Sequence, residues 1–370
     1  MRFRQSALEG LGMNSNFWKE KKVLVTGHTG FKGSWLSLWL QSLGANVVGY
    51  ALQPPTQPSL FEIADIADGM TSIIGDVRDL KHLQSVFGEH GPEIVFHLAA
   101  QPLVRYSYEN PVETYTTNVI GTMHMLESVR HSETVRVVVS ITSDKCYENR
   151  EWYWGYRETD RLGGHDPYSS SKGCAELVIA AYRNSYFPPE AYERHGVALA
   201  STRAGNVIGG GDWATDRLIP DIMRAIMEDR SVIIRSPHAI RPWQHVLEPL
   251  NGYLCLAEQM WTRGPKLAQA WNFGPSSDEA RTVSWIVEYL AGRWGEGARW
   301  ELDAAQHPHE DTYLKLDCSK ARSLLGWAPK LRLSTTLEWI VEWYRGYQQD
   351  KDMRSLTEDQ IARFESIEVA

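Results

Sequence analysis

Tyr168 and Lys172, a tyrosine and a lysine four residues apart, have the types and spacing that suit proton chemistry. If Tyr168 opens a helix, Lys172 lies one turn further along the same face, so both side chains can reach one substrate. A neighbouring cation favours the phenolate, so we expect Lys172 to lower the pKa of Tyr168 from about 10 toward neutrality and make it a general base. A solvated helix face is the alternative interpretation of such a short motif.

A second polar group follows an apolar, β-branched run at 135–141, which is typical of a buried strand. Ser143, Asp144 and Lys145 come directly after this run. The strand therefore delivers a hydroxyl, a carboxylate and an ammonium group to the C-terminal edge of a sheet, where the sites of open α/β folds lie. We expect these three residues to share one site with the tyrosine and the lysine.

Near the start of the chain, an apolar strand at 22–26 runs into a glycine-containing turn and then a helical pattern. Gly27 permits the tight turn, Gly30 lets the backbone approach a pyrophosphate, and Gly33 lets the helix pack on the strand. The helix N-terminus supplies N–H groups and partial positive charge. This order of elements predicts a dinucleotide site. The turn is expected to hold the cofactor through Gly27, Thr29, Gly30, Phe31 and Gly33.

The strands that follow bear on the kind of dinucleotide. The second strand, 46–50, leads into Tyr-Ala-Leu-Gln at 50–53, where an Asp or Glu would usually hold the adenosine ribose. No arginine stands there to meet a 2′-phosphate, so NAD is favoured over NADP, with ribose contacts that are weaker or come from elsewhere. Asp76 ends the third strand, 73–76, where it either accepts from the adenine amino group or caps the next helix.

The fourth strand leads into Leu98, Ala99 and Ala100, which would let a nicotinamide ribose lie close to the backbone. A helical pattern at 112–131 contains Asn118, a polar residue on an otherwise packed face. Strands that alternate with helices predict an α/β fold, a Rossmann-type doubly wound parallel sheet.

The regular alternation stops near residue 218, and helical stretches joined by short strands follow. We predict an N-terminal extension at 1–20, an NAD-binding Rossmann domain with the catalytic residues at 21–204, and a C-terminal tail at 351–370. Residues 205–350 are expected to form mainly a smaller, interleaved substrate-binding domain, with some segments returning to the sheet. A glycine run at 209–211 either closes over a ligand or merely turns.

Composition excludes several classes of protein. The net charge is −8 and no Lys/Arg block stands out, which argues against a nucleic-acid partner. No apolar run approaches the roughly twenty residues of a membrane helix, and residues 1–16 lack the apolar region of a secretory signal. Four cysteines without a CxxC pair predict reduced thiols in a cytoplasmic protein and no metal site; His307 and His309 are interpreted as part of a polar loop.

On these motifs, the chain resembles the extended short-chain dehydrogenase/reductase superfamily from about residue 20 to 350. Within it, the nucleotide-sugar 4,6-dehydratases carry an acid/base pair just after the active-site hydroxyl, a place where simple epimerases lack one. The matching positions are Thr26-Gly27-x-x-Gly30-Phe31-x-Gly33, Asp76-Val77, His97-Leu98-Ala99-Ala100, Asn118-Val119-x-Gly121-Thr122 and Tyr168-x-x-x-Lys172.

Ser143, Asp144 and Lys145, followed by Cys146-Tyr147, are similar to the branch that acts on CDP-glucose, whereas the dTDP-glucose branch has Thr-Asp-Glu. The resemblance implies a Rossmann domain that carries NAD and a C-terminal domain that holds the nucleotide sugar. The implied product is a 4-keto-6-deoxy sugar for surface-polysaccharide synthesis. Open alternatives are a sister enzyme acting on dTDP-glucose, a UDP-sugar 4-epimerase and a non-catalytic NAD-binding protein.

The resemblance also implies a mechanism. Tyr168, supported by Lys172 and Ser143, takes the 4-hydroxyl proton while hydride passes from C4 to NAD. A base removes the C5 hydrogen, Asp144 protonates the departing 6-hydroxyl, and hydride returns to C6. Lys145 is either that base, in its neutral form, or an electrostatic stabiliser of the enolate.

The remaining site residues are implied by the resemblance as well. The cofactor contacts would include Val77, Tyr168 and Lys172 besides the residues above, and Asn118 would help to order the active-site helix or a water. Asn206, Arg217, Arg241 and Tyr313 would meet the nucleotide sugar, with surface ion pairs or a core aromatic as the alternatives. Helices at 112–131 and 168–187 would pair between subunits, giving a homodimer or a dimer of dimers.

Overall fold

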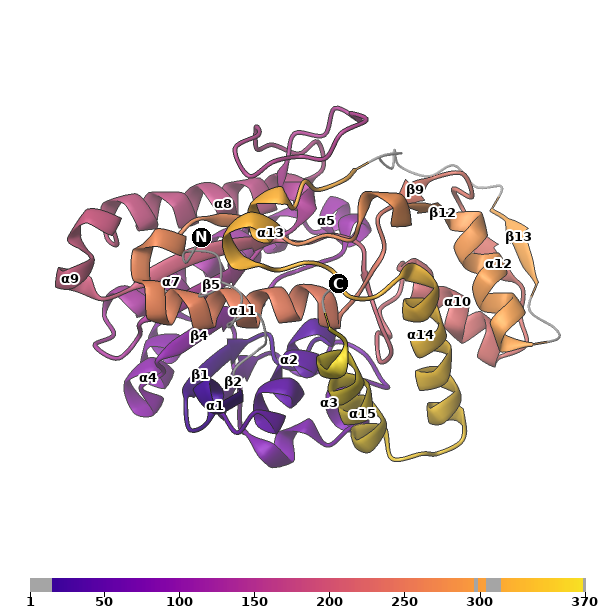
Figure 1. The fold of residues 1–370 in the computed structure, drawn as a ribbon, viewed down its shortest axis with the longest axis horizontal. Helices are drawn as coiled ribbons and strands as arrows, with labels where there is room; N and C mark the ends of the chain where they lie inside the picture. The colour runs from indigo at the N-terminus through magenta and orange to yellow at the C-terminus, as the bar shows by residue number, and fades with distance from the viewer. Residues whose placement is uncertain (1–14, 296–298, 304–313, 369–370) are drawn as a thin grey trace, which may run out of the picture.

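The structure, a computed structural model, describes residues 15–295, 299–303 and 314–368. Its centre is a parallel sheet of seven strands in the order β11-β6-β5-β4-β1-β2-β3 (Figure 1). This is the doubly wound arrangement predicted from the alternation of strands and helices. The strands are β1 (Lys22–Thr26), β2 (Asn46–Ala51), β3 (Thr71–Ile74), β4 (Ile94–His97), β5 (Val137–Ile141), β6 (Ala198–Arg203) and β11 (Ala270–Asn272).

The central strands are rich in apolar residues, as expected for parallel strands that are covered on both faces. Every residue of β4, β5 and β6 is buried. Side chains alternate between two cores: Val23 and Val25 of β1 lie in one, and Leu24 lies in the other. The register of β4 with β5 pairs His97 with Ser140, so their carboxyl ends lie at the same edge of the sheet.

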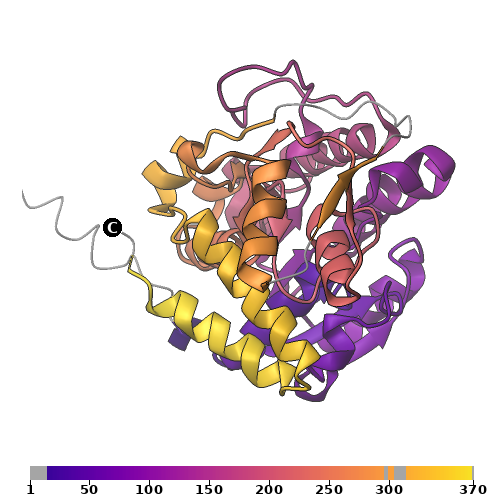
Figure 2. The same cartoon turned by 90° about the vertical axis from the view of Figure 1, so that its right-hand side faces the viewer.

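Helices cover each face of this sheet (Figures 1 and 2). The larger core contains buried residues of α2 (Phe31–Ser42) and α11 (Leu247–Arg263), and the smaller core those of α4 (Leu80–His90), α7 (Gly121–Arg130) and α8 (Pro167–Ser185). The two faces therefore hold different helices against one shared sheet. Shorter helices are α1 (Ser15–Trp18), α3 (Leu60–Ile63), α5 (Val104–Glu109), α6 (Pro111–Tyr115) and α9 (Tyr192–His195).

The C-terminal part of the chain builds a smaller lobe beside the sheet, at the right of Figure 1, and sends β11 back to pair with β6. This interleaving is the arrangement expected for residues after 204. The lobe and its connections contain β7 (Val207–Ile208), α10 (Leu218–Met227), β8 (Val232–Ile234), β9 (Ile240–Arg241), β10 (Gln244–His245), β12 (Arg281–Thr282), α12 (Val283–Trp294), β13 (Trp300–Leu302), α13 (Ser319–Leu325), α14 (Leu333–Gln348) and α15 (Met353–Ser366).

Three regions differ from the prediction. The helix expected at 112–131 is divided into α6 and α7 by a π-helical turn at Thr116–Ile120. The expected tail at 351–370 contains α15, which runs beside α14 in Figure 2 and packs against α2 through Phe364 and Trp39. Within the expected N-terminal extension, Trp18 of α1 is fully buried in the larger core. Both terminal segments are held by the burial of large aromatic side chains. The sequence of one segment does not show which distant residues will cover these side chains.

The glycine run at 209–211 is fastened by tryptophan and tyrosine side chains. The Trp35 indole N–H donates to the Gly210 carbonyl at 3.0 Å, and the Tyr344 hydroxyl donates to the Asp212 carbonyl at 2.5 Å. A Cβ on Gly210 would overlap the Trp343 ring of α14. The run is therefore a packed connection between the sheet and the smaller lobe.

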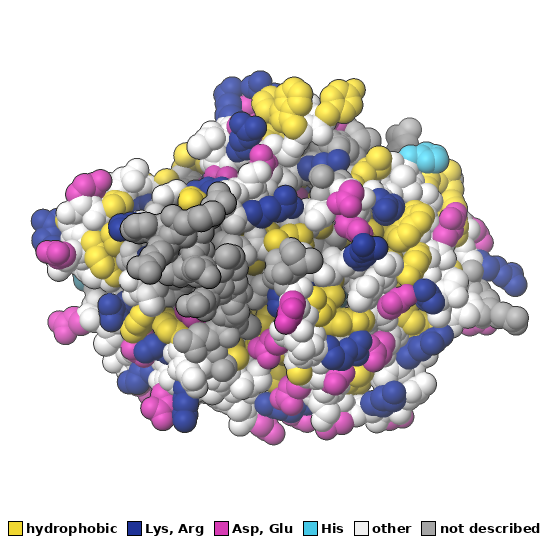
Figure 3. Space-filling view, in the orientation of Figure 1, with side chains coloured by type: hydrophobic (Ala, Val, Ile, Leu, Met, Phe, Trp, Pro, Cys, Tyr) yellow, Lys and Arg dark blue, Asp and Glu magenta, His cyan; other side chains and the backbone are white. Residues whose placement is uncertain are grey.

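On the face drawn in Figure 3, acidic and basic side chains are interspersed, and hydrophobic side chains project at the top of the view. The exposed large hydrophobic residues include Tyr153 and Trp154, which lie in the connection between β5 and α8. Among the described residues, every helix is too short or too polar to cross a membrane. All four cysteines are free.

We expect Gly210→Ala to lower the stability by about 1–3 kcal/mol, because the new methyl group overpacks against Trp343. Gly292→Ala is the matched control: it lies within α12, and a Cβ there has open space. The control is expected to be neutral or to stabilise by about 0.5–1 kcal/mol, since glycine is a poor helix former. Urea denaturation of both variants measures the difference. Equal stability of the two would contradict the packing described for the glycine run.

Candidate active site

The first polar group lies where β5 ends. Residues 144–146 form a single 3-10 turn, and Ser143 caps it by accepting from the Lys145 N–H at 3.2 Å. The Ser143 hydroxyl donates to the Asp144 carboxylate at 2.9 Å. Ser143 and Asp144 are buried, whereas Lys145 is half-buried. The turn thus presents a hydroxyl and a carboxylate that are already in contact.

The second group lies on α8, which begins at Pro167, one residue before Tyr168. Asp166 caps this helix by accepting from the Ser169 N–H at 2.9 Å, and proline suits the first helical position. Tyr168 and Lys172 are both buried, and the Lys172 Nζ lies 6.0 Å from the centre of the Tyr168 ring. A solvated helix face, the alternative interpretation of this pair, is therefore wrong.

The expected lowering of the Tyr168 pKa is wrong for the structure described. Burial raises the pKa of Tyr168 to about 12, although a hydrogen bond with Ser143 and the charge of Arg217 act in the opposite direction. Burial also lowers the pKa of Lys172 to about 8, and the carboxylate of Glu176 opposes this shift. Ser143 and Arg217 are thus neighbours that favour the phenolate in this arrangement.

The glycine turn meets the same edge of the sheet. Gly27 has φ +78°, and a Cβ there would lie 2.7 Å from the backbone nitrogen of Ala99, so the turn and the end of β4 approach as closely as glycine allows. The Thr29 hydroxyl donates to the Leu52 carbonyl at 2.9 Å, which ties the turn to the end of β2. Phe31 begins α2 and packs against the larger core. Gly30 precedes α2, and Gly33 is the third residue of this helix, where a Cβ would overlap the Gly27 carbonyl oxygen.

Asp76 does not cap the following helix, so that alternative is wrong. The cap of α4 is Asp79, which accepts from the His82 N–H at 3.1 Å. Arg78 holds the Asp76 carboxylate, donating to it at 2.6 Å, and lowers the pKa of that group although burial acts against this. Asp76 thus remains an ionised acceptor beyond β3. The adjacent Val77 is buried.

Asn118 lies in the π-helical turn and connects two parts of the site. Its side-chain oxygen accepts from the Gln101 N–H at 2.8 Å, just after the partly buried residues Leu98, Ala99 and Ala100. Its amide group donates to the Ser171 hydroxyl at 2.8 Å, and that hydroxyl donates to the Tyr168 carbonyl at 2.7 Å. Asn118 therefore ties the end of β4 to the first turn of α8.

Lys32, which the sequence analysis missed, adds a cation to the site. It is the second residue of α2, and burial together with Arg217 and Lys172 lowers its pKa to about 7, while Asp144 raises it. Arg217 donates to Asp212 at 3.0 Å, and this pairing keeps the pKa of Arg217 above its ordinary value despite burial. Three basic groups from distant segments thus converge where an anionic ligand would be stabilised. The position of Lys32 in the sequence, directly after the glycine turn, could have indicated that it belongs to the site.

A cavity of about 300 Å³ opens beside Asp144. It is lined by residues of the segments 153–157, 274–276 and 315–319, and it includes the basic side chains of Arg157, Lys315 and Arg322. Gly205, which follows β6, forms part of this lining, and a Cβ there would overlap the Asp144 carboxylate. The carboxylate is therefore confined between the turn and the backbone after β6.

The predicted substrate contacts lie at several places around the site. Asn206 has φ +50° next to Gly205, and its carbonyl accepts from the Gln244 N–H at 3.1 Å. Arg241 is half-buried in β9, next to Pro242, which lines the cavity. Tyr313 lies outside the described residues, as do His307 and His309. Among the described residues, no cluster of His, Cys, Asp and Glu could hold a metal ion.

Comparison with known proteins agrees with the fold described above. The sequence profile described as GDP-mannose 4,6 dehydratase matches residues 24–340. The chain belongs to this family.

Individual relatives extend this result. The CDP-glucose 4,6-dehydratase of Salmonella typhimurium is 58% identical over 354 residues, which cover 96% of this chain and 99% of that protein. A UDP-glucose 4-epimerase of Halalkalibacterium halodurans is 25% identical, covering 87% of this chain and 95% of that one. The structure of a dTDP-glucose 4,6-dehydratase of Streptomyces venezuelae superposes with a TM-score of 0.75 at 22% identity, over 90% of this chain and 99% of that chain. At this identity, the similarity to the Streptomyces venezuelae structure shows a shared fold.

Binding of NAD is expected to take up protons just above pH 7. The pKa of Lys32 is about 7 in the free protein, and a pyrophosphate beside it would raise this pKa. The uptake should vanish near about pH 5, where Lys32 is already protonated. Calorimetric titration in buffers of different ionisation enthalpy measures it.

The variant Lys32→Met should abolish this uptake. Lys81→Met, which removes an exposed lysine on α4, should retain it and serves as the control. Uptake that persists in Lys32→Met would mean that another group titrates.

Proposed function

We propose that this protein converts CDP-glucose to CDP-4-keto-6-deoxyglucose and water, as a CDP-glucose 4,6-dehydratase. The observation that carries the proposal is the buried Asp144 carboxylate, held by Ser143 at the edge of the cavity. A 4-epimerase needs no acid to expel a hydroxyl, whereas elimination of the 6-hydroxyl does. The 58% identity to the CDP-glucose enzyme over nearly the whole chain supports the choice of nucleotide.

NAD fits the residues at the glycine turn. Three features match a dinucleotide: the close backbone packing at Gly27, the start of α2 and the ionised Asp76 beyond β3. Residues 50–53 contain no arginine that could bind a 2′-phosphate, which favours NAD over NADP. Bound NAD would accept hydride from sugar C4 and return it to C6, so no net redox change occurs. The residues proposed to hold it are Gly27, Thr29, Gly30, Phe31, Gly33, Asp76, Val77, Leu98, Ala99, Ala100, Asn118, Tyr168 and Lys172.

In this mechanism, Tyr168 takes the proton of the sugar 4-hydroxyl. Its pKa of about 12 makes Tyr168 a strong base once it is deprotonated. The hydrogen bond with Ser143 offsets part of the free energy needed to ionise the buried phenol. Lys172, with a pKa of about 8, would be substantially cationic near neutral pH and would stabilise the phenolate. Removal of the proton raises electron density at C4, which favours oxidation there.

Asp144 and Lys145 would then carry out the elimination. The new 4-keto group acidifies the C5 hydrogen, and the base that removes it is assigned to Lys145. Asp144 would protonate the departing 6-hydroxyl, because its carboxyl group borders the cavity. The two residues are adjacent in one turn, so a single sugar ring could meet both.

Substrate contacts are proposed for Asn206, Arg217, Arg241 and Tyr313. The electrostatic interaction of Arg217 with Tyr168 supports a contact near the reacting end of the sugar. The position of Arg241 next to a cavity-lining proline supports a phosphate contact, for which arginine geometry is suited.

We also propose that the protein is cytoplasmic and assembles as a homodimer or a dimer of dimers. Exposed hydrophobic side chains on the helices around α8 support the assembly; they include Tyr106, Tyr108, Val112, Ile120 and Leu177. The 4-keto-6-deoxy product would supply deoxysugars for surface polysaccharides such as O-antigen.

Incubation with CDP-glucose in heavy water tests the proposed reaction. We expect mass spectrometry to show loss of one water and gain of one solvent deuterium at C5. The parallel reactions with dTDP-glucose, UDP-glucose and GDP-mannose are expected to show no product. Unchanged mass with altered stereochemistry would indicate an epimerase, and no change with any sugar would remove the catalytic assignment.

Lys145→Ala is expected to slow exchange of the C5 hydrogen with solvent by roughly 100-fold or more, the usual contribution of a general base. Proton NMR of the sugar nucleotide in heavy water follows this exchange. Lys81→Ala, an exposed change on α4, is the control and should leave the rate unaltered. Normal exchange in Lys145→Ala would leave electrostatic stabilisation as the role of this residue.

A further inference from the structure

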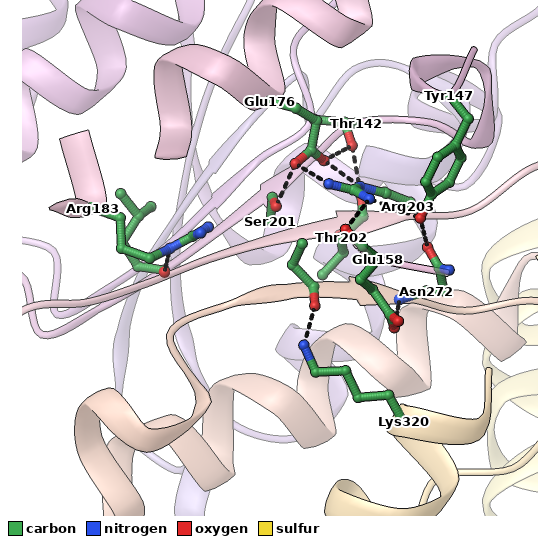
Figure 4. Close-up of polar contacts among 12 residues, drawn as sticks. Thr142, Tyr147, Glu158, Glu176, Arg183, Ser201, Thr202, Arg203, Asn272 and Lys320 are labelled. Carbon is green, nitrogen blue, oxygen red and sulfur yellow. Dashed lines mark hydrogen bonds and ion pairs between the residues drawn. The ribbon is translucent and has the colours of Figure 1, made fainter. Parts of the chain in front are cut away.

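A buried ion pair lies directly beneath the candidate active site. Arg203 at the end of β6 donates to Glu176 of α8 through its Nε at 3.0 Å and a terminal nitrogen at 2.8 Å, and both side chains are 3% exposed (Figure 4). Burial alone would raise the pKa of Glu176, but Arg203 and hydrogen bonds from neighbouring hydroxyls lower it. Apolar residues of similar volume often stabilise a core at least as well, so stability gives no sufficient reason for this pair.

The ion pair holds both ends of the turn that carries the acid and the base. Before the turn, the Thr142 hydroxyl donates to Glu176 at 2.6 Å. After it, Tyr147 accepts from Arg203 at 2.7 Å, and the guanidinium carbon lies 4.8 Å from the centre of the same ring. Figure 4 shows Arg203 between Glu176 and Tyr147. The segment from Thr142 to Tyr147 is thus clamped at its two flanks by one buried pair.

Further contacts make this clamp rigid. The Tyr147 hydroxyl donates to Asn272 of β11 at 2.8 Å, and Asn272 donates to the Tyr156 carbonyl at 2.8 Å. Ser201 of β6 donates to the second oxygen of Glu176 at 2.8 Å. Strands β6 and β11, helix α8 and the turn are therefore joined by hydrogen bonds whose donors and acceptors are mostly buried, where such networks are strongest.

The clamp also relates the turn to the other catalytic group. Glu176 follows Lys172 by one turn of α8, and its charge raises the pKa of Lys172 against the effect of burial. Gly205, two residues after Arg203, packs on the Asp144 carboxylate. The pair therefore connects the two elements that present the proposed reacting side chains, the turn and α8, to the end of β6.

We propose that Glu176, Arg203 and Tyr147 are positioning residues, which hold Asp144 and Lys145 in place relative to Tyr168. This inference rests on the proposed function for its catalytic consequence. Tyr147 is itself the residue that ends the turn, and its hydroxyl contacts Arg203 and Asn272 rather than α8. Loss of this hydroxyl should therefore loosen the acid and the base more than it loosens Tyr168. Elimination should then slow while oxidation at C4 continues.

The test is Tyr147→Phe, with Tyr156→Phe as the matched control. Tyr156 stacks on Tyr147 with ring centres 5.2 Å apart, but its hydroxyl bonds to the loop at 149–150 instead of to Arg203. For Tyr147→Phe we expect the rate of water loss to fall roughly 10- to 100-fold, the effect of a misplacement of about 1 Å, with KM little changed. Rapid-quench mass spectrometry should reveal a 4-keto sugar nucleotide that still retains its 6-hydroxyl. Tyr156→Phe should not accumulate it.

A second measurement does not need substrate. Hydrogen–deuterium exchange should be at least tenfold faster at the amides of Lys145, Cys146 and Tyr147 in Tyr147→Phe, because their hydrogen bonds lie within the turn. In Tyr156→Phe these amides should exchange as in the wild type. Unchanged exchange in Tyr147→Phe would overturn the inference, whichever sugar the protein uses.

Arg203→Lys extends the test, because lysine keeps the charge but cannot make the bidentate and tyrosine contacts together. The double variant Arg203→Lys with Tyr147→Phe should lose water no more slowly than Arg203→Lys alone, because both substitutions remove the same contact between Arg203 and Tyr147. Multiplicative losses, or equal losses of C4 oxidation and water loss in Tyr147→Phe, would show a merely structural role. If the wild type releases no water from any sugar, the proposed function fails, and the exchange measurement alone decides this inference.

Discussion

The chemistry of this protein depends on one geometric constraint: parallel strands end at the same edge of their sheet. Strands β1, β4, β5 and β6 are adjacent in the sheet, and the loops after them bring the glycine turn, the residues around Ala99, the Ser143 turn and Gly205 together. These segments are separated by as many as about 180 positions in the chain. The strands are mostly apolar, and polar residues gather at their carboxyl ends and in the loops that follow, where the chain leaves the core.

Burial at this edge gives the site its electrostatic character. It lowers the pKa of Lys172 to about 8 and that of Lys32 to about 7, and it raises the pKa of Tyr168 to about 12. Each shift favours the neutral form of its group, since a charge loses its hydration in the interior. An anionic pyrophosphate would offset part of that loss for the lysines. The site is therefore suited to ligands that bring negative charge, which a nucleotide sugar and a dinucleotide both do.

The proposed reaction depends on the turn after β5 rather than on the fold. A 4-epimerase relative matches 87% of this chain, so the scaffold alone does not decide the reaction. The proposed assignment as a dehydratase rests on Asp144, because expulsion of a hydroxyl needs an acid, and this carboxylate is confined by Ser143 and by the backbone at Gly205. The buried pair of Glu176 and Arg203 beneath the turn gives that confinement a physical basis.

The sequence by itself determined the doubly wound sheet, most strand positions and the helix that carries Tyr168 and Lys172, because apolar runs, glycine turns and caps are local signals. It also indicated an acid beside Ser143. Tertiary structure alone decided that burial raises the pKa of Tyr168, that Arg217 and Lys172 approach Lys32, and that Asp79 rather than Asp76 caps α4. It likewise decided that α15 packs on α2 and that Arg203 meets Glu176. These features depend on distances between segments far apart in the chain and on the water excluded between them, neither of which a local pattern records.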